Sequence, residues 1–296
     1  MHEDLRLYLF EFIGRFMDRF SFEDYIKRVL SEDIGDGDHT SLATIPPDKI
    51  GKAKLLVKEN GIIAGIDVAK KIVEFYDSEL QLDIHYNDGD AVKKGDKVFF
   101  IEGKAQSILS LERTILNIMQ RMSAIATKTR RITDIISHTQ CRLLDTRKTT
   151  PLFRYFEKEA VKIGGGVNHR FGLYDMVMIK DNHVDYAGGI TQAIHKTNGY
   201  LKKHKKDLKI EIEVRNLDEL NEVLAVGNVH RIMLDNFNVT TLEKAVSLIG
   251  GRFETEASGG ITEDNILEYA LTGVDFISVG ALTHSVKSLD LSLKAM

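Results

Sequence analysis

Most of the residues that could do chemistry lie in one stretch of the chain, Cys141–His183. Two short apolar runs in this stretch, at residues 143–144 and 176–179, each pass directly into polar residues. Continuous apolar residues with polar ones only at the carboxyl end are typical of a buried parallel strand. The two tips read Asp-Thr-Arg-Lys at 145–148 and Lys-Asp-Asn-His at 180–183.

Four cations and a histidine come from these two tips and the segment between them. That segment holds a predicted amphipathic helix over 154–162, three glycines at 164–166 and Asn-His-Arg at 168–170. Crowded like charges repel, so the cluster is unfavourable unless an anionic ligand binds to it. The sequence therefore predicts an anion-binding site formed by Arg147, Lys148, His169, Arg170 and Lys180.

The chain after Cys141 alternates between strand and helix patterns, which predicts an α/β domain with a parallel sheet. Six strand–helix units are fewer than the eight of a complete barrel. We therefore expect a barrel-like or incomplete barrel, with a doubly wound open sheet as the alternative. The predicted strands are 142–146, 176–180, 209–214, 231–235, 252–257 and 276–280, and the later helices are 186–198, 217–226, 241–248 and 263–271.

The remaining strand tips also carry polar residues or glycine. Glu213 ends the third predicted strand, with Glu211 two residues earlier on the same face, and Asp235 ends the fourth. Ligands of parallel α/β proteins bind at the carboxyl ends of the strands. One acid at a strand end is more often structural, but all six tips together favour a functional site.

Two glycine-containing loops are suited to a phosphate group. Ser258-Gly259-Gly260 opens a predicted helix, where glycines let backbone N–H groups approach an anion and the helix dipole favours it. Ser278-Val279-Gly280 follows the next strand. Barrels often hold a phosphate in their last two loops of this kind, so the pair predicts a phosphorylated substrate.

Glu213 and Asp235, on neighbouring predicted strands, suit a divalent cation or the hydroxyls of a sugar. Magnesium typically binds a few carboxylates together with substrate phosphates. The sequence contains no cluster of Cys and His residues with the spacing of a zinc site. We therefore expect Mg²⁺, if a metal takes part.

The first part of the chain predicts a separate domain. Residues 1–30 have helical spacing of apolar residues, and 32–41 form a predicted structured loop without the spacing of a calcium loop. Residues 52–104 are β-rich: a strand over 52–58, a turn at 59–61, a return strand from Ile62, a helix over 68–76, and strands near 80–86 and 97–102. A long amphipathic helix over 107–138 links the two domains.

Length and charge limit the classes of function. A chain of 296 residues is long enough for two domains, and a net charge of −4 argues against general affinity for nucleic acid. Neither a signal peptide nor a membrane span is visible. The single cysteine, Cys141, excludes an intrachain disulfide and fits a reducing cytoplasm. Its place at a strand start indicates a buried apolar residue.

Several ordered motifs resemble those of the quinolinate phosphoribosyltransferases. One departure is Leu152-Phe153 after Pro151, where a glycine commonly follows. The resemblance spans nearly the whole chain. It rests on Asp-Thr-Arg-Lys-Thr-Thr-Pro (145–151), Gly-Gly-Gly-Val-Asn-His-Arg (164–170), Ile-Lys-Asp-Asn-His (179–183), Leu-Asp-Asn (234–236) and Ala-Ser-Gly-Gly-Ile (257–261), with Glu-Asp-Ile-Gly-Asp-Gly-Asp (32–38) and Leu-Glu-Arg-Thr (111–114) nearer the N-terminus.

The resemblance implies an N-terminal α/β sandwich domain, 1–112, and an open, incomplete TIM-like α/β barrel, 113–284, with a tail, 285–296, that returns to the first domain. It also implies homodimers, in some members larger assemblies such as hexamers, whose sites take residues from both subunits. The implied partners are quinolinate and phosphoribosyl pyrophosphate. The implied products are nicotinate mononucleotide, pyrophosphate and carbon dioxide, as in NAD biosynthesis.

The resemblance also implies a role for each site residue. Lys148 and Lys180 would lie between the pyridine and the pyrophosphate, and Glu213 and Asp235 would meet ribose hydroxyls and magnesium. His284 would flank the phosphate end. The two carboxylates of quinolinate would be held by Arg113 from the partner chain, Arg147, His169 and Arg170, and the 5-phosphate by Ser258, Gly259, Gly260 and Gly280.

Three alternatives remain open at this point. A related transferase of the same fold, associated with molybdenum transport, would use another acceptor. A barrel lyase would use Lys180 to form a Schiff base. A barrel that only binds a ligand would be expected to lack some of the polar strand tips, and none is missing here.

Overall fold

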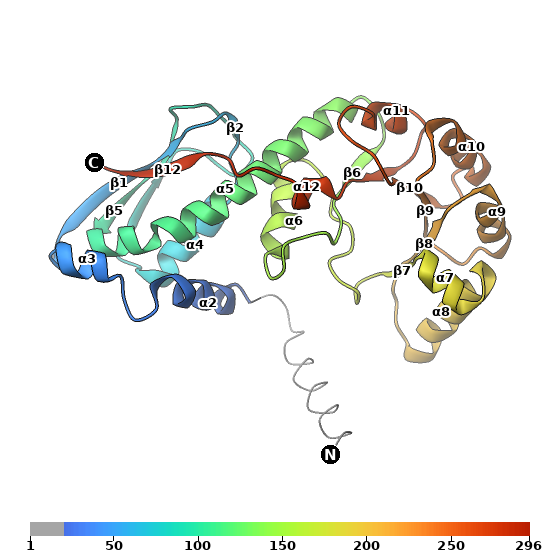
Figure 1. Ribbon diagram of the computed structural model, residues 1–296, viewed down its shortest axis with the longest axis horizontal. Helices are drawn as coiled ribbons and strands as arrows, with labels where there is room; N and C mark the ends of the chain where they lie inside the picture. The colour runs from blue at the N-terminus through green and yellow to red at the C-terminus, as the bar shows by residue number, and fades with distance from the viewer. Residues whose placement is uncertain (1–20) are drawn as a thin grey trace, which may run out of the picture. The chain divides into compact units, whose positions relative to one another are not determined.

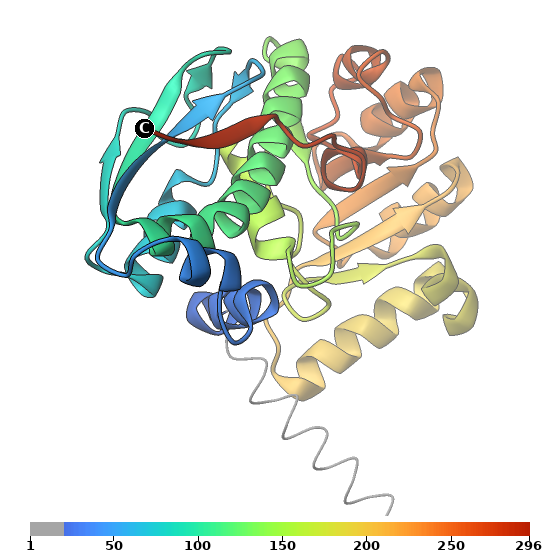
Figure 2. The same ribbon diagram turned by 60° about the vertical axis from the view of Figure 1, so that its left-hand side comes forward.

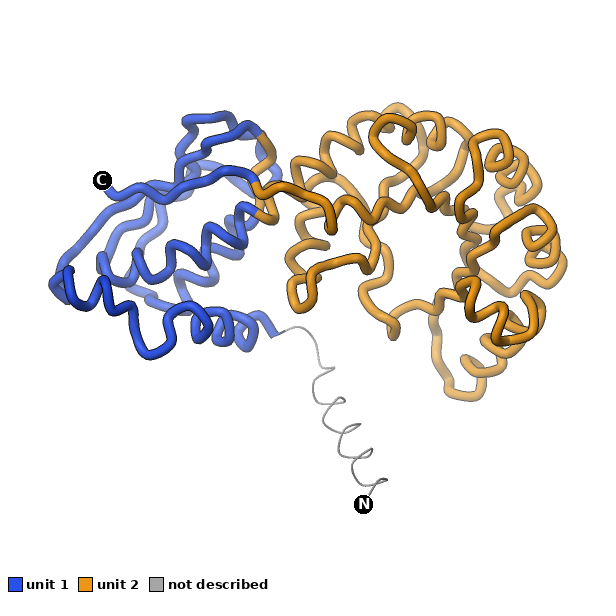
Figure 3. The backbone as a smooth tube through the Cα atoms, in the orientation of Figure 1, with its two compact units in different colours: residues 1–60, 65–120, 289–296 blue, residues 61–64, 121–288 orange. Residues whose placement is uncertain are grey.

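The computed structural model describes residues 21–296, which form two compact units (Figure 3). The first contains the described residues up to 60 together with 65–120 and 289–296, and the second contains 61–64 and 121–288. The helical pattern predicted for 1–20 lies outside the described residues. The domain limits 1–112 and 113–284 stay a prediction.

The first unit is built on a four-stranded antiparallel sheet in the order β12-β1-β5-β3. Its register places buried Leu55 opposite buried Leu293 and buried Val57 opposite Leu291, which makes one face of the sheet apolar. The C-terminal strand β12 lies beside β1 in both views (Figures 1 and 2). The strands are β1 (Ile50–Val57), β3 (Gln81–Ile84), β5 (Lys97–Lys104) and β12 (Leu291–Ala295).

Helices supply the second layer of this unit. Ile72 of α4 and Leu111 of α5 are fully buried, as expected for helices that cover an apolar sheet face. The helices are α2 (Phe22–Ile34), α3 (His39–Thr44), α4 (Ile66–Tyr76) and the first part of α5 (Ala105–Ile136), with two short strands, β2 (Gly61–Ile62) and β4 (Ala91–Val92), outside the four-stranded sheet.

The predicted return strand after the turn at 59–61 is wrong, because the neighbours of β1 are β5 and β12. Residues 61–64 instead belong to the second unit and bond to the side chains of α5. The backbone N–H of Ile62 donates to Thr127 Oγ1 at 2.8 Å, and that of Ala64 donates to Ser123 Oγ at 2.9 Å. A short strand, β2, does form here, but it lies outside the sheet of β1 and does not return along that strand.

The second unit has a six-stranded parallel sheet in the order β6-β11-β10-β9-β8-β7. The strands from β7 to β11 follow one another across the sheet without the reversal of a doubly wound fold, which removes that alternative. In the described part of the chain no ladder joins β6 to β7, so the barrel is open between them. The strands are β6 (Arg142–Leu144), β7 (Val177–Ile179), β8 (Ile210–Val214), β9 (Arg231–Asp235), β10 (Glu254–Ser258) and β11 (Phe276–Ser278).

Helices lie outside these strands (Figures 1 and 3). The helix predicted over 186–198 is two helices, because Gly188 and Gly189 take positive φ angles of 95° and 128° and break it. The helix predicted from 263 begins at Ile266. The helices are α6 (Arg154–Ile163), α7 (Asp181–Ala187), α8 (Ile190–His204), α9 (Leu217–Val226), α10 (Val239–Ile249), α11 (Ile266–Ala270) and α12 (Ala281–His284).

The second part of α5 packs against α6. Arg121 of α5 donates to the buried carboxylate of Glu157 at 2.8 Å, and Gly164 ends α6 where it meets α5. A Cβ at Gly164 would lie 2.6 Å from the carbonyl oxygen of Ala126, so only glycine fits at this close approach. No helix among the described residues is both long and apolar enough to cross a bilayer.

Candidate active site

The carboxyl ends of the parallel strands surround a cavity of about 480 Å³. The predicted convergence of the strand tips is therefore confirmed. The polar residues that line this cavity, which we call the strand-tip cavity, are Thr146, Arg147, Lys148, His169, Arg170, Lys180, Asp181, Glu213, Asp235, Glu256, Ser258 and Ser278, with Met178 and Met233.

Two adjacent charged residues of α6 hold the two loops that carry the cations. Glu157 accepts from the backbone N–H of Thr150 at 3.0 Å and from its hydroxyl at 2.9 Å. Lys158 donates to Asp145 Oδ1 at 2.6 Å and to the carbonyl oxygen of His169 at 2.9 Å. Both side chains are fully buried, so the loops are fixed by charge-assisted hydrogen bonds in a low dielectric.

The cation side of the cavity is formed by Arg147 and Arg170. Arg170 Nη1 donates to the carbonyl oxygen of Met176 at 3.2 Å, which orients the guanidinium. Burial lowers the pKa of Arg170, and the charge of Arg147 lowers it further. Two half-buried guanidinium groups that repel each other form a site suited to a planar dianion.

The opposite side of the cavity is acidic. Lys180 Nζ donates to Glu213 Oε2 at 2.7 Å, and Asn236 Nδ2 donates to Asp235 Oδ2 at 2.6 Å. Burial raises the pKa of Asp235, and the charge of Glu213 raises it further. A cation between these carboxylates would relieve their repulsion, and their oxygen ligands are those that Mg²⁺ prefers.

A buried cluster of charges lies at the floor of the strand-tip cavity. His169 Nε2 is 3.0 Å from Glu211 Oε2 and 3.3 Å from Glu256 Oε2, and Arg231 Nη1 donates to Glu256 at 3.1 Å. Sequence reasoning missed Glu256 and Arg231. The only available signal was a set of charged residues inside segments otherwise predicted as buried strands, since buried charges require partners.

The glycine loops differ in part from the prediction. Gly259 has a φ of +96° and lies so close to the Asn236 side chain that a Cβ would collide with it. Gly280 packs against Lys148, whose Cδ would be 2.9 Å from an added Cβ. However, α11 begins only at Ile266, so the predicted helix dipole does not lie directly behind Gly260. Among the residues of these two loops, Ser258 and Ser278 line the cavity.

Several residues with predicted roles do not line the strand-tip cavity. The cavity lining does not include the three loop glycines, Gly259, Gly260 and Gly280. His284 is exposed, and its Nδ1 lies 2.7 Å from Ser285 Oγ. Arg113 belongs to the first unit, where it is exposed on α5. Cys141 is buried, as predicted, and burial raises the pKa of its thiol to about 12, which excludes a thiolate nucleophile near neutral pH.

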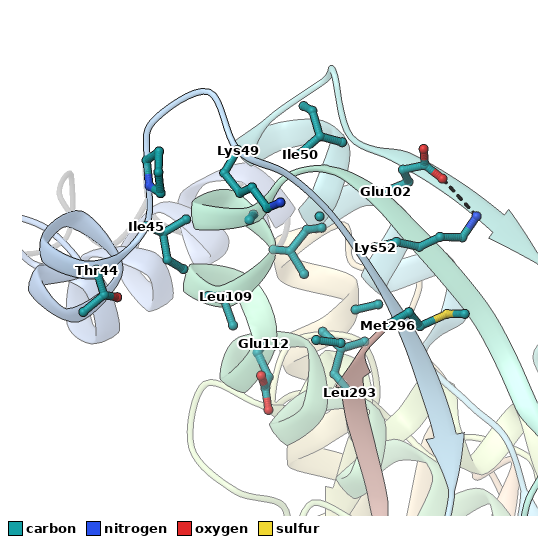
Figure 4. Close-up of a pocket in the computed structure, with 16 residues that line it drawn as sticks. Thr44, Ile45, Lys49, Ile50, Lys52, Glu102, Leu109, Glu112, Leu293 and Met296 are labelled. Carbon is teal, nitrogen blue, oxygen red and sulfur yellow. Dashed lines mark hydrogen bonds and ion pairs between the residues drawn. The ribbon is translucent and has the colours of Figure 1, made fainter.

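The first unit contains a larger cavity, about 770 Å³ (Figure 4). Its lining is mostly apolar, with Ile45, Leu109 and Leu293 among the side chains, and Lys52 pairs with Glu102 at 2.9 Å. None of the residues predicted from the strand tips lines it. The smaller strand-tip cavity, with charges of both signs, is the better candidate for the chemistry.

Comparison with known families shows which family this chain belongs to. The model of the quinolinate phosphoribosyl transferase C-terminal domain matches residues 125–294, and that of the N-terminal domain matches residues 38–123. This chain belongs to the quinolinate phosphoribosyltransferase family. The predicted family resemblance is therefore confirmed over both units.

Curated relatives of the family are similar over most of their length. Quinolinate phosphoribosyltransferase [decarboxylating] 1b of Nicotiana tabacum is 49% identical over 284 residues, which cover 91% of this chain and 81% of that protein. The probable nicotinate-nucleotide pyrophosphorylase [carboxylating] of Bacillus subtilis is 40% identical over 280 residues, or 94% of each chain.

Solved structures of the family have the same fold. NadC from Streptococcus pyogenes superposes with a TM-score of 0.87 at 37% identity, covering 92% of this chain and 96% of that one. The nicotinate-nucleotide pyrophosphorylase of Francisella tularensis gives a TM-score of 0.85 at 40% identity, covering 94% and 98%. The predicted α/β fold class is thus confirmed.

Proposed function

We propose that this protein transfers the phosphoribosyl group of phosphoribosyl pyrophosphate to quinolinate and decarboxylates the product. The products are nicotinate mononucleotide, pyrophosphate and carbon dioxide, in the de novo synthesis of NAD. One observation carries the proposal. In a chain of this family, one cavity is lined both by the cations of Arg147, Lys148, Arg170 and Lys180 and by the carboxylates of Glu213 and Asp235.

The arginines provide the site for the two carboxylates of quinolinate. A guanidinium offers parallel N–H groups that match a carboxylate, and Arg147 has a buried Nε with no protein partner. Arg170 and Arg147 repel each other until an anion binds. Arg113 of a second subunit, carried over by motif, would add another cation.

The acidic side provides the site for the phosphoribosyl pyrophosphate. Glu213 and Asp235 would bind ribose hydroxyls and Mg²⁺, with Lys148 and Lys180 beside the leaving group, Ser258, Gly259, Gly260 and Gly280 around the 5-phosphate, and His284 at its flank. Magnesium, when bound, would offset the charge of the departing pyrophosphate. Burial and, after it, the charge of Glu213 raise the pKa of Asp235, and a cation bound at this place would relieve the repulsion between the two carboxylates.

The reaction requires positioning and charge more than a nucleophilic side chain. The pyridine nitrogen forms a bond to C1 of the ribose as the bond from C1 to the pyrophosphate oxygen breaks. The new pyridinium withdraws electrons, so the bond from C2 to its carboxylate can break and C2 takes up a proton. Fixed cations around a charged transition state are the main means by which proteins accelerate such steps.

The same proposal includes a homodimer with shared active sites. Larger assemblies such as hexamers would be built from that dimer. Arg113 is exposed on α5 and remote in sequence from the strand tips, which supports a role in the site of another subunit. For the location we propose the cytoplasm, which the single buried cysteine supports. The relatives from Arabidopsis thaliana and Oryza sativa are named chloroplastic.

The ion pair of Lys180 argues against the Schiff-base alternative. Lys180 Nζ is engaged by the carboxylate of Glu213 at 2.7 Å, whereas a Schiff-base lysine needs its nitrogen free to attack a carbonyl carbon. Treatment with borohydride and substrate should therefore leave the protein unmodified.

Release of pyrophosphate tests the proposal. The purified protein with phosphoribosyl pyrophosphate and Mg²⁺ should release pyrophosphate only when quinolinate is added, and EDTA should stop the release. Pyrophosphate release that does not depend on quinolinate, or none at all in folded protein, would overturn the proposed function.

A further inference from the structure

The charged cluster at the cavity floor consists of groups that the reaction itself does not require. Glu211 of β8, Arg231 of β9 and Glu256 of β10 surround His169, and each of the two glutamates is fully buried. Isolated buried charges are unfavourable by several kcal/mol, so their presence beside a substrate site calls for a physical reason.

Glu256 is the central member of this cluster. One of its oxygens, Oε2, lies 3.3 Å from His169 Nε2 and 3.1 Å from Arg231 Nη1. Arg231 is itself held from the other side by Glu254 at 3.0 Å and lies over the ring of Phe276 at 4.1 Å. Arg231 therefore fixes Glu256 in the position from which Glu256 faces the imidazole.

We propose that Glu256, fixed by Arg231, is a positioning residue that keeps the His169 ring oriented and positively charged at the floor of the strand-tip cavity. This inference rests on the proposed function, because the charge of His169 is taken to attract the anionic substrate. His169 then acts chiefly through its charge, since its Nε2 is directed at the two glutamates, 3.0 Å and 3.3 Å away.

The groups around His169 change the pKa of its imidazole in opposite directions. Burial lowers the pKa of the imidazole, but the contacts and charges of Glu211 and Glu256 outweigh burial and raise the pKa to about 9. The backbone N–H of Arg170 approaches Nδ1 at 2.6 Å and favours the neutral ring. The charged groups packed around the histidine act at different points. Glu211 and Glu256 face its ring, and Arg231 contacts both of these glutamates. The backbone of His169 bonds to Asp145 and Lys158, and Arg170 follows it in the chain.

The two glutamates are not equivalent. Burial raises the pKa of Glu211 to about 7, and the charge of Glu256 adds to that increase. Burial alone would also raise the pKa of Glu256, but His169, Ser278 and Arg231 together outweigh burial and lower the pKa. Glu256 lines the strand-tip cavity and lies 3.1 Å from Arg231, whereas Glu211 is 4.0 Å from that arginine, so Glu256 is the residue to substitute.

Glu254 offers a matched control. It also pairs with Arg231 and lies on the same strand, but no contact joins it to His169 among the described residues. Glu256→Gln and Glu254→Gln therefore each remove one carboxylate charge that lies beside Arg231. Only Glu256→Gln also removes a carboxylate charge that lies beside His169.

The test follows the titration of His169 by NMR in ligand-free protein labelled at histidine, with the resonance assigned by its loss in His169→Asn. We expect Glu256→Gln to lower the pKa of His169 by at least about one unit, and Glu254→Gln to change it by less than about 0.3 unit. The KM for quinolinate should rise only about twofold in Glu256→Gln at pH 8 and approach about tenfold by pH 10, because the charged fraction of His169 falls in that proportion. The kcat should change less, and Glu256→Asp should restore part of the affinity.

An unchanged His169 titration in folded Glu256→Gln, or an equal shift in Glu254→Gln, would overturn the inference. The titration needs no substrate, so it separates this inference from the proposed function. If wild-type protein showed the elevated pKa of His169 but did not turn over quinolinate, the proposed function would fail while the role of Glu256 in setting the histidine charge would stand.

Discussion

Lys180 and Glu213 form an ion pair of 2.7 Å across the tips of the neighbouring strands β7 and β8. The lysine is partly exposed and the glutamate is buried at the edge of the strand-tip cavity. The ion pair therefore links two residues with different proposed roles. Lys180 is proposed to lie beside the leaving pyrophosphate, and Glu213 is proposed to bind the ribose and magnesium.

Replacing Lys180 with methionine should lower kcat/KM by at least about a hundredfold, because a cation beside the developing negative charge is lost. Stability should change little, since a partly exposed ion pair contributes about 1 kcal/mol or less. Lys162→Met is the control, as Lys162 also pairs with a glutamate, at 2.9 Å, but on the exposed face of α6. Equal kinetics for the two variants in steady-state assays would remove Lys180 from the site.

Mixing two inactive variants tests the shared site. Arg113→Ala and Arg147→Ala should each abolish activity, and their mixture should recover about a quarter of the wild-type value. Random dimers are half hybrids, and each hybrid carries one site with both arginines intact. Subunit exchange is verified by mass spectrometry of differently tagged chains. Exchange without recovery would mean that Arg113 acts within its own chain.

The charge of His169 should make stability depend on pH. Its folded pKa of about 9 exceeds the ordinary histidine value of 6.5 expected in the unfolded chain, so the folded state gains stability that is complete below pH 6.5 and lost as the pH rises through 9. The difference amounts to about 3 kcal/mol by linkage. Urea unfolding between pH 7 and 10 should show a steeper loss for wild type than for His169→Gln. Parallel curves would contradict a raised pKa.

Leu152, which follows Pro151, has a φ of 63° in the left-handed region. The side chain is 80% exposed, so its removal loses little packing. Leu152→Gly should therefore stabilise the protein by up to about 1 kcal/mol, since relief of strain exceeds the entropy cost of glycine. Leu173→Gly is the control, because Leu173 is 70% exposed without a positive φ. Lower stability of Leu152→Gly in thermal unfolding would show that the loop tolerates leucine without strain.

The parallel strands and their tips could be predicted because each is local in the sequence. An apolar run that passes into Lys180 or Asp235 contains all the information needed to place that residue at a strand end. The sheet of the first unit could not be predicted in the same way, since β1 pairs with β12 from the far end of the chain. The break between α7 and α8 was readable from Gly188-Gly189 but was hidden by a continuous helical pattern.

The buried charges were harder to predict, for a physical reason. Glu256 alternates with Glu254 along its strand, as residues on a solvated face would, and Arg231 stands at the start of a strand, where a charge is common. Only the folded barrel brings the two side chains together. The pairing of Lys158 with Asp145 likewise depends on how α6 packs beside the first strand tip. Such contacts are tertiary, so composition and spacing do not reveal them.

The choice of substrate tests the central claim most directly. Arg147 and Arg170, with His169 beneath them, provide more positive charge than one carboxylate requires, and sites built for a polar group reject analogues that lack it. Turnover is measured for quinolinate labelled in its C2 carboxylate and for nicotinate, each with phosphoribosyl pyrophosphate and Mg²⁺. We predict labelled carbon dioxide and nicotinate mononucleotide in equal amounts from quinolinate, and a kcat/KM for nicotinate at least about a thousandfold lower. Comparable kcat/KM values for the two acids, or turnover of quinolinate without labelled carbon dioxide, would contradict the account.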